Sequence, residues 1–279
     1  MNSKFKKTAI AGVVIGCMML TGVGAVAWAN GNAYQEYKQV VQQTLSAENM
    51  TVNSQVTIKQ DGRLLMEGGI LMQSDGKTCY MSSDWQIGND SMTMESNLGE
   101  KAMVIRMGDH YFTSDTANPH SDGEFTPSPS MIKLMEMVAD LLVGDVKNYF
   151  VSDGDSISVH LEGAQIPELV HVAAAAVMES MKAHPQRMPE GHQPIGAVLE
   201  ELAIDQAIQV QSVHLNAVIQ DGFLQDQVLT VVISGKDEAG TAHEMELVGQ
   251  FLISEIGTTV AATIDTSGQT VEVMERFHR

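Results

Sequence analysis

Histidines and carboxylates are the residues of this 279-residue chain whose spacing could carry catalysis. His243-Glu244 begins like the two-histidine zinc motif of metalloproteases, but Leu247 stands where the second histidine would be. Apolar and polar residues alternate there, which is typical of a strand and not of the helix that this motif needs. The chain has no G-x-S-x-G sequence and no Walker loop for phosphate. The sequence therefore predicts a protein that is not an enzyme.

Two other segments contain residue types that bind metal ions in proteins. His184 and His192 share one loop with Met188 and Glu190, and thioether and imidazole ligands suit copper. The segment 153–155 (Asp-Gly-Asp) lacks the ligand series and the terminal glutamate of a calcium loop. We interpret the first as a solvated loop and the second as a plain turn. No metal ion and no cofactor is expected.

The charge and the cysteines exclude further classes. There are 16 Lys and Arg residues against 35 Asp and Glu, a formal net charge of −19, whereas binding to nucleic acid needs a basic face. Two cysteines cannot form a disulfide framework. Cys79 lies in a strand-like context, where a small buried side chain is the ordinary interpretation and a reactive thiol the alternative.

The first 29 residues read as an export signal. Three lysines precede an uncharged apolar run from Thr8 to Ala29 that ends in Ala-Trp-Ala, the pattern of a signal-peptide cleavage site. The run is also long enough to cross a bilayer, so residues 8–29 could instead remain as a membrane anchor. A third alternative is lipidation at Cys17, which follows Val-Ile-Gly. All three alternatives predict an extracytoplasmic chain.

The period of the apolar residues predicts two groups of strands separated by helices. Helical spacing of Tyr34, Tyr37, Val41 and Leu45 predicts a helix over 33–45. Alternation then predicts five or six strands over 52–112, with Leu64 among the inward residues and turns at two Asp-Gly pairs. Alternation returns over 208–273, with a change of phase near Ser212 that indicates a bulge.

The middle of the chain supplies the remaining helices. Apolar stripes predict helices over 128–144, 167–182 and 195–202, and a hairpin over 149–161. Neither group of strands has a second layer of its own, so each needs the helices to cover its apolar face. The expected fold is α+β: a large curved antiparallel sheet, an open half-barrel, with helices packed on its concave face. Residues 30–279 are expected to form a single domain.

Methionine is unusually frequent and falls on the inward positions. The chain has 19 Met against 14 aromatic residues (7 Phe, 5 Tyr and 2 Trp). Methionine is flexible, and adaptable binding surfaces use it often. Either these side chains fill an ordinary core or they line an accessible apolar trough. The candidate trough residues are Met66, Met72, Met94, Met103, Met107, Met131, Met135 and Met181.

The order of these elements resembles a known family. An exported leader, a helix, a meander, inserted helices and a closing meander are similar to the LolA/LppX-like lipoprotein-carrier superfamily. The segments 233–237 (Ile-Ser-Gly-Lys-Asp) and 254–257 (Ser-Glu-Ile-Gly) resemble uncharacterised Gram-positive members. The resemblance implies an open half-barrel that binds acyl chains, and it transfers no site residue.

Two functions follow as expectations. The first is a non-enzymatic binding protein for an apolar ligand: a lipid, an acyl chain or a lipopeptide. The second is a membrane-anchored envelope domain that serves as a structural or protein-interaction module without a ligand.

Overall fold

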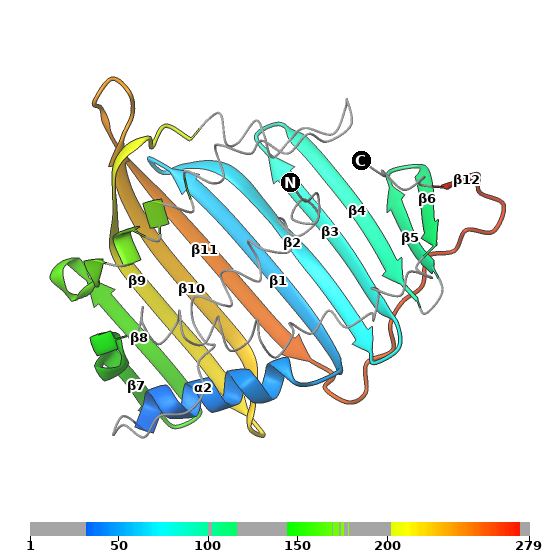
Figure 1. Cartoon of the computed structure of the whole chain (residues 1–279), viewed down its shortest axis with the longest axis horizontal. Coiled ribbons are helices and arrows are strands. Elements are labelled where there is room, and N and C mark those ends of the chain that lie inside the picture. The colour runs from blue at the N-terminus through cyan, green and yellow to red at the C-terminus, as the bar shows by residue number, and fades with distance from the viewer. Residues whose placement is uncertain are drawn as a thin grey trace.

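A single curved sheet dominates the computed structural model, which describes residues 32–99, 102–115, 144–168, 202–273 and some positions between 170 and 178. Twelve strands follow the order β12-β6-β5-β4-β3-β2-β1-β11-β10-β9-β8-β7 (Figure 1). All neighbours pair antiparallel except β12 and β6, which are parallel. The sheet does not close, because β12 and β7 are its two edges. The expected α+β open half-barrel is confirmed.

The first half of the sheet is a six-stranded meander. Its strands are β1 (Asn49–Gln60), β2 (Arg63–Asp75), β3 (Cys79–Ile87), β4 (Asp90–Leu98), β5 (Ala102–Met107) and β6 (His110–Asp115). At the first turn both Asp61 (φ 51°) and Gly62 (φ 77°) have positive φ, as a two-residue type I′ turn requires. The Asp-Gly pair therefore closes a tight hairpin, as its sequence predicts.

The second half of the sheet is also antiparallel, and most of it follows the helical part of the chain. Its strands are β7 (Phe150–Asp153), β8 (Ser156–Glu162), β9 (Gln206–Gln220), β10 (Phe223–Lys236) and β11 (Ala242–Ser254), with short 3-10 helices η2 (Gly144–Tyr149) and η3 (Gly163–Gln165). A last short strand, β12 (Val271–Val273), returns to the first half and pairs with β6. Strand β11 pairs with β1 over ten residues, and this pairing fuses the two halves. The change of phase near Ser212 is confirmed, because the register shifts by one residue at Gln211.

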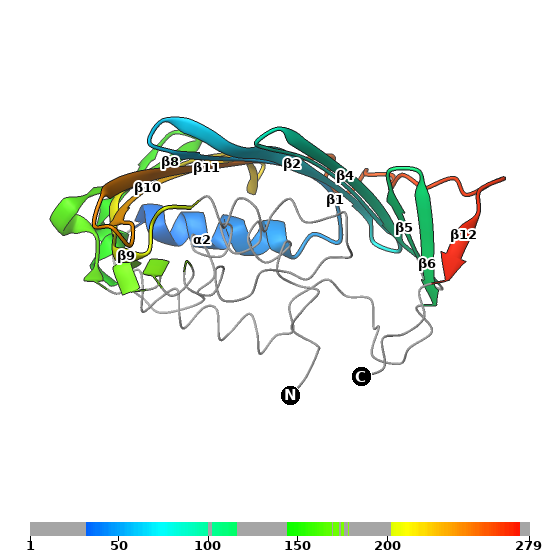
Figure 2. The ribbon, with the colours of Figure 1, turned by 90° about the horizontal axis from the view of Figure 1, so that it is seen from above.

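Helix α2 (Asn32–Leu45) lies on the concave side of the sheet (Figure 2). Tyr37, Val40 and Val41 are buried in the same core as Phe251 of β11 and Leu229 of β10. Tyr34 and Tyr37 also contact the ring of Phe150 on β7, with centroids 5.0 and 5.6 Å apart. The helix therefore packs across one end of strands β7–β11 (Figure 1), and burial of its apolar stripe stabilises it there.

Two expected core positions are wrong. Leu64 is 43% exposed and its neighbour Leu65 is buried, because the β1–β2 register shifts between Ile58 and Lys59. A bulge of one residue exchanges which side chains face the core. Leu45, at the end of α2, is exposed, and Thr44 is buried in its place.

The other expected helices fall largely outside the described residues. Almost all of the helix expected over 128–144 lies outside the described residues, and so do the leader and most of 195–202. Within 167–182, residues 168, 170–172, 174, 175 and 178 are helical, and Met178 is buried. Among the helices of the described chain, none is both long and apolar enough to cross a membrane.

Candidate apolar binding face

The register places one row of side chains across the whole concave face. In an antiparallel pair, directly opposite residues point to the same side. The row runs through Ile157, Ala217, Gln227, Phe251, Ser54, Ile70, Ser83, Met94 and Met107. Its first members lie in the core that α2 covers, and its last two lie on β4 and β5. The face that holds the core therefore continues onto the β4–β6 wing.

All described candidate methionines point to this concave face. Met66 and Met72 oppose Ile58 and Val52 of β1, and Met94, Met103 and Met107 follow in register on β4 and β5. The sequence-based alternation therefore places these five side chains on the expected side. The remaining three candidates, Met131, Met135 and Met181, lie outside the described residues.

The five methionines fall into two groups by their packing. Met66 belongs to the buried core and Met72 packs against it. Met94, Met103 and Met107 are half-buried and belong to no part of that core. The first two therefore act as core residues, and the other three are the ones that could meet a ligand.

The apolar surface of the β4–β6 wing includes other residues besides its methionines. Leu98 opposes Met103, Ile105 opposes Phe112, and all four side chains point to the concave side and are half-buried. We call the set Met94, Leu98, Met103, Ile105, Met107 and Phe112 the methionine face. In Figure 2, β5 and β6 bend toward the side on which α2 lies. The methionine face therefore looks into the hollow of the half-barrel.

Two buried polar atoms border the methionine face. Ser83 and Trp85 point to the concave side of β3, opposite Met94 and Met92. Ser83 Oγ and Trp85 Nε1 are buried, and within the described part of the chain neither has a hydrogen-bond partner. An unpaired buried donor costs about 1–3 kcal/mol. Two such donors side by side, next to flexible methionines, are a feature that packing alone does not explain.

The position of Trp85 depends on a glycine of the neighbouring strand. Gly68 of β2 lies opposite Trp85, and a Cβ on it would come within 2.5 Å of the indole atom Cε3. The indole therefore lies directly against the backbone of β2. Glycine is needed here because any side chain would push the ring away.

The convex side of the same wing is polar. Arg106 Nη1 lies 3.1 Å from Glu95 Oε2, and the Tyr80 hydroxyl donates to Glu95 Oε1 at 2.8 Å. Burial and the hydrogen bond to Glu95 raise the pKa of the Tyr80 hydroxyl. The contrast between the two sides shows that the methionine face is not simply an apolar strand exposed on both sides.

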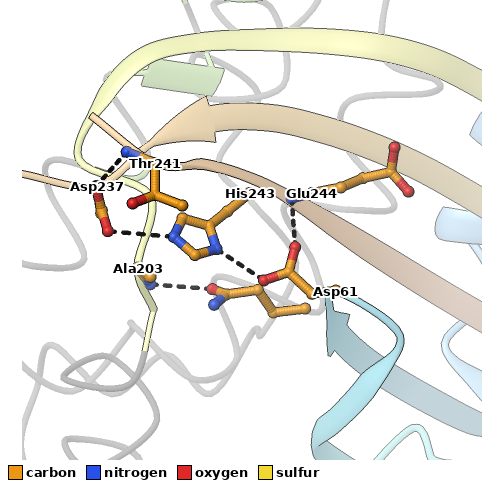
Figure 3. A network of polar contacts seen from close by, with 7 residues as sticks. Asp61, Ala203, Asp237, Thr241, His243 and Glu244 are labelled. Atoms are coloured by element: carbon orange, nitrogen blue, oxygen red, sulfur yellow. Dashed lines mark hydrogen bonds and ion pairs between the residues drawn. The ribbon is translucent and has the colours of Figure 1, made fainter. Parts of the chain in front are cut away.

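The His243 segment, which resembled a zinc motif, forms part of a turn-to-turn network instead (Figure 3). His243 Nδ1 lies 2.7 Å from Asp61 Oδ2, and Nε2 lies 3.4 Å from Asp237 Oδ2. Asp61 Oδ1 accepts from the Glu244 amide, and Asp237 Oδ1 accepts from the Thr241 amide. Since carboxylates hold both ring nitrogens, the ring has no free nitrogen to act as a general base. The geometry favours a structural role, joining the β1–β2 turn to the β10–β11 turn.

Cys79, for which a buried side chain was expected, is only partly buried. It is half-buried at the start of β3 and points to the concave side. Burial, and in second place the charge of Asp75, raise the pKa of its thiol. A raised pKa lowers the fraction of thiolate, which is the reactive form.

One polar cluster was missed by reasoning from the sequence. His160 and Glu162 on β8 lie beside His214 on β9, although the two histidines are far apart in the chain. The detectable signal was the His-x-Glu spacing, which puts both side chains on one side of a strand. The partner histidine could be found only from the strand pairing.

The comparisons with known proteins add one distant structural likeness. No family model and no curated protein matches the chain. Among solved structures, the chain is similar to a LolA superfamily protein from Nitrosomonas europaea at 8% identity and a TM-score of 0.22, with 85% of this chain and 97% of that chain covered. This is a weak resemblance at the level of the fold.

Proposed function

We propose that this protein is an extracytoplasmic, non-enzymatic binding protein for an apolar ligand that carries an acyl chain, such as a lipid or a lipopeptide. The observation that carries the proposal is the methionine face. Six half-buried apolar side chains continue the concave face of the sheet beyond the core that α2 covers.

Burial of this face against an acyl chain would supply the binding free energy. Each buried methylene contributes about 0.8 kcal/mol, so about ten buried methylenes, roughly one medium-length acyl chain, correspond to micromolar affinity before the cost of association. Methionine side chains are unbranched and adjust to the path of a chain. The face therefore suits a flexible apolar ligand better than a rigid polar one.

The unpaired donors of Ser83 and Trp85 indicate which polar group the ligand carries. A hydroxyl and an indole N–H next to an apolar face match an acceptor oxygen joined to a hydrocarbon chain, such as a carboxylate or an ester carbonyl. Rotation of the Met94 side chain would open a path from the methionine face to Ser83, which it opposes. We therefore expect the polar end of the ligand near β3 and its chain over β4–β6.

The extracytoplasmic location rests on the N-terminal segment alone. Its lysines and its apolar run support export by any of the three routes described above. In that location the partners would be the ligand itself and, if the leader is retained, the cytoplasmic membrane through residues 8–29.

A fluorescent fatty acid tests the proposed function. We expect dansyl-labelled undecanoic acid to bind the full chain in a saturable way, with enhanced and blue-shifted emission. Met94→Gln should weaken binding roughly ten-fold, because it places an amide where the hydrocarbon lies. The matched control is Thr93→Gln, which makes the same side chain on the exposed convex side of the same strand.

The outcomes separate the two functions. Saturable binding that weakens in Met94→Gln and not in Thr93→Gln supports the proposal. No saturable binding, or equal binding by both folded variants and the unchanged chain, overturns it. A lack of saturable binding would leave the envelope domain without a ligand.

A further inference from the structure

Two histidines and a glutamate converge on the convex side of β8 and β9. His160 and His214 are direct partners in the antiparallel register, and Glu162 follows two residues after His160. Val159 and Leu161 are buried on the concave side, so His160 and Glu162 point away from the core. The cluster thus lies on the side of the sheet opposite to the methionine face, and the inference does not depend on the proposed function.

Both imidazoles approach the same carboxylate oxygen. His160 Nε2 lies 2.8 Å from Glu162 Oε1, and His214 Nε2 lies 3.9 Å from it. The ring centroids are 3.8 Å apart with an angle of 40° between the planes. One ion pair accounts for the shorter contact. It does not account for the second imidazole, which is too far from the oxygen for a hydrogen bond and would repel the first if both were protonated.

A shared metal ion accounts for all three side chains. Zinc lies about 2.0–2.2 Å from nitrogen and oxygen ligands, so two donors of a tetrahedral site are about 3.3 Å apart. The two measured separations bracket this value, and all three donor atoms lie within 4.8 Å of one another. The side chains are 46–64% exposed, so small rotations can complete the geometry without disturbing the core.

We propose that His160, Glu162 and His214 bind a divalent transition-metal ion, with water completing the coordination. Two imidazoles and one carboxylate suit zinc or copper, whereas calcium and magnesium need an all-oxygen set. The net charge of −19 also favours the approach of a cation. This proposal revises the expectation that the protein has no metal site. The sequence alone could not show that His160 and His214, on two different strands, lie side by side.

Calorimetric titration of the untagged full chain with Zn²⁺, after treatment with a chelator, tests the site. We expect a saturable site at pH 7.5 that weakens at least ten-fold in His160→Gln and in His214→Gln, each checked for folding by circular dichroism. The matched control is His110→Gln, at an exposed histidine on β6. Binding should also weaken between pH 7.5 and 5.5, because histidine must lose its proton to bind the ion.

Three results would overturn the proposal. One is the lack of saturable Zn²⁺ binding by the unchanged chain. Another is a His160→Gln/His214→Gln double variant that binds as tightly as the unchanged chain, which would place the ion elsewhere. The third is an equal loss of affinity in His110→Gln, which would indicate non-specific binding to surface histidines.

Discussion

The Tyr37 hydroxyl of α2 donates a 2.6 Å hydrogen bond to Gln227 Oε1 of β10, and both side chains are fully buried. This bond joins α2 to β10 on the concave face. A second hydrogen bond also joins α2 to β10: the Leu224 amide of β10 donates to Thr44 Oγ1 of α2 at 2.9 Å. Tyr37, near the middle of the helix, and Thr44, near its C-terminal end, therefore fix α2 over β10, which leaves the β4–β6 wing uncovered by α2.

Tyr37→Phe should destabilise the protein without changing its fold. The substitution removes one buried hydrogen bond and keeps the ring in place, so the free energy of unfolding should fall by about 1–3 kcal/mol. Urea denaturation measures it. Tyr80→Phe is the matched control, because it removes a tyrosine hydrogen bond on the convex side and should cost less than about 1 kcal/mol. Equal losses in both variants would contradict the proposed anchoring role of Tyr37.

The His243 network predicts a pH dependence of stability. Its hydrogen bonds, first to Asp61 and then to Asp237, raise the pKa of His243 from the ordinary value of 6.5. The folded state thus holds the proton more tightly, so the stabilisation is fully present below about pH 6.5 and is lost as pH rises through the raised pKa.

Protonation of Asp61 and Asp237 removes the stabilisation by the same network at low pH. The pKa of Asp61 is lowered from 3.8, mainly by its hydrogen bond with His243, and that of Asp237 mainly by the Thr241 amide. Their contribution is present above about pH 3.8 and is lost as pH falls through the lowered values. The difference in stability between the unchanged chain and His243→Asn should be largest between about pH 4 and 6.5 and should shrink above that range. A difference that grows toward pH 9 would contradict this assignment.

Ser83→Ala should stabilise the protein while weakening the binding of a carboxylate ligand. The substitution removes a buried hydroxyl that has no partner in the described chain, so the free energy of unfolding should rise by about 1 kcal/mol. Ser54→Ala is a closely matched control. Ser54 lies two strands away in the same row and donates to the Ile70 carbonyl at 3.2 Å, so its loss should destabilise by about 1 kcal/mol. If Ser83→Ala is destabilised as much as Ser54→Ala, the hydroxyl of Ser83 is paired and the inference about the ligand's acceptor loses its basis.

The sequence predicts most of the sheet because each strand carries its own local signal. Alternation with Asp-Gly turns defines β1, β2, β9 and β10, and the same alternation puts Met94 and Met107 on the concave side. The period changes at the bulge beside Ile58, and there the expectation for Leu64 fails. A single extra residue has no distinctive composition, so alternation alone cannot locate it.

The pairing between distant strands could not be predicted in this way. Nothing in β1 marks β11 as its partner, and this pairing turns two meanders into one sheet. Met66 belongs to the buried core whereas Met94 is half-buried outside it, and no local pattern encodes this difference. The His160–His214 cluster has the same origin, because its two halves meet only through the β8–β9 register.

Photo-crosslinking with a diazirine-labelled fatty acid tests the central claim most directly. The full chain is irradiated with the bound probe, digested, and mapped by mass spectrometry. We predict that the label falls on the methionine face, at residues such as Met94, Met103 and Met107, and that excess unlabelled fatty acid prevents it. Label confined to convex-side residues such as Thr93 and Arg106, or label that competitor does not reduce, would contradict the account.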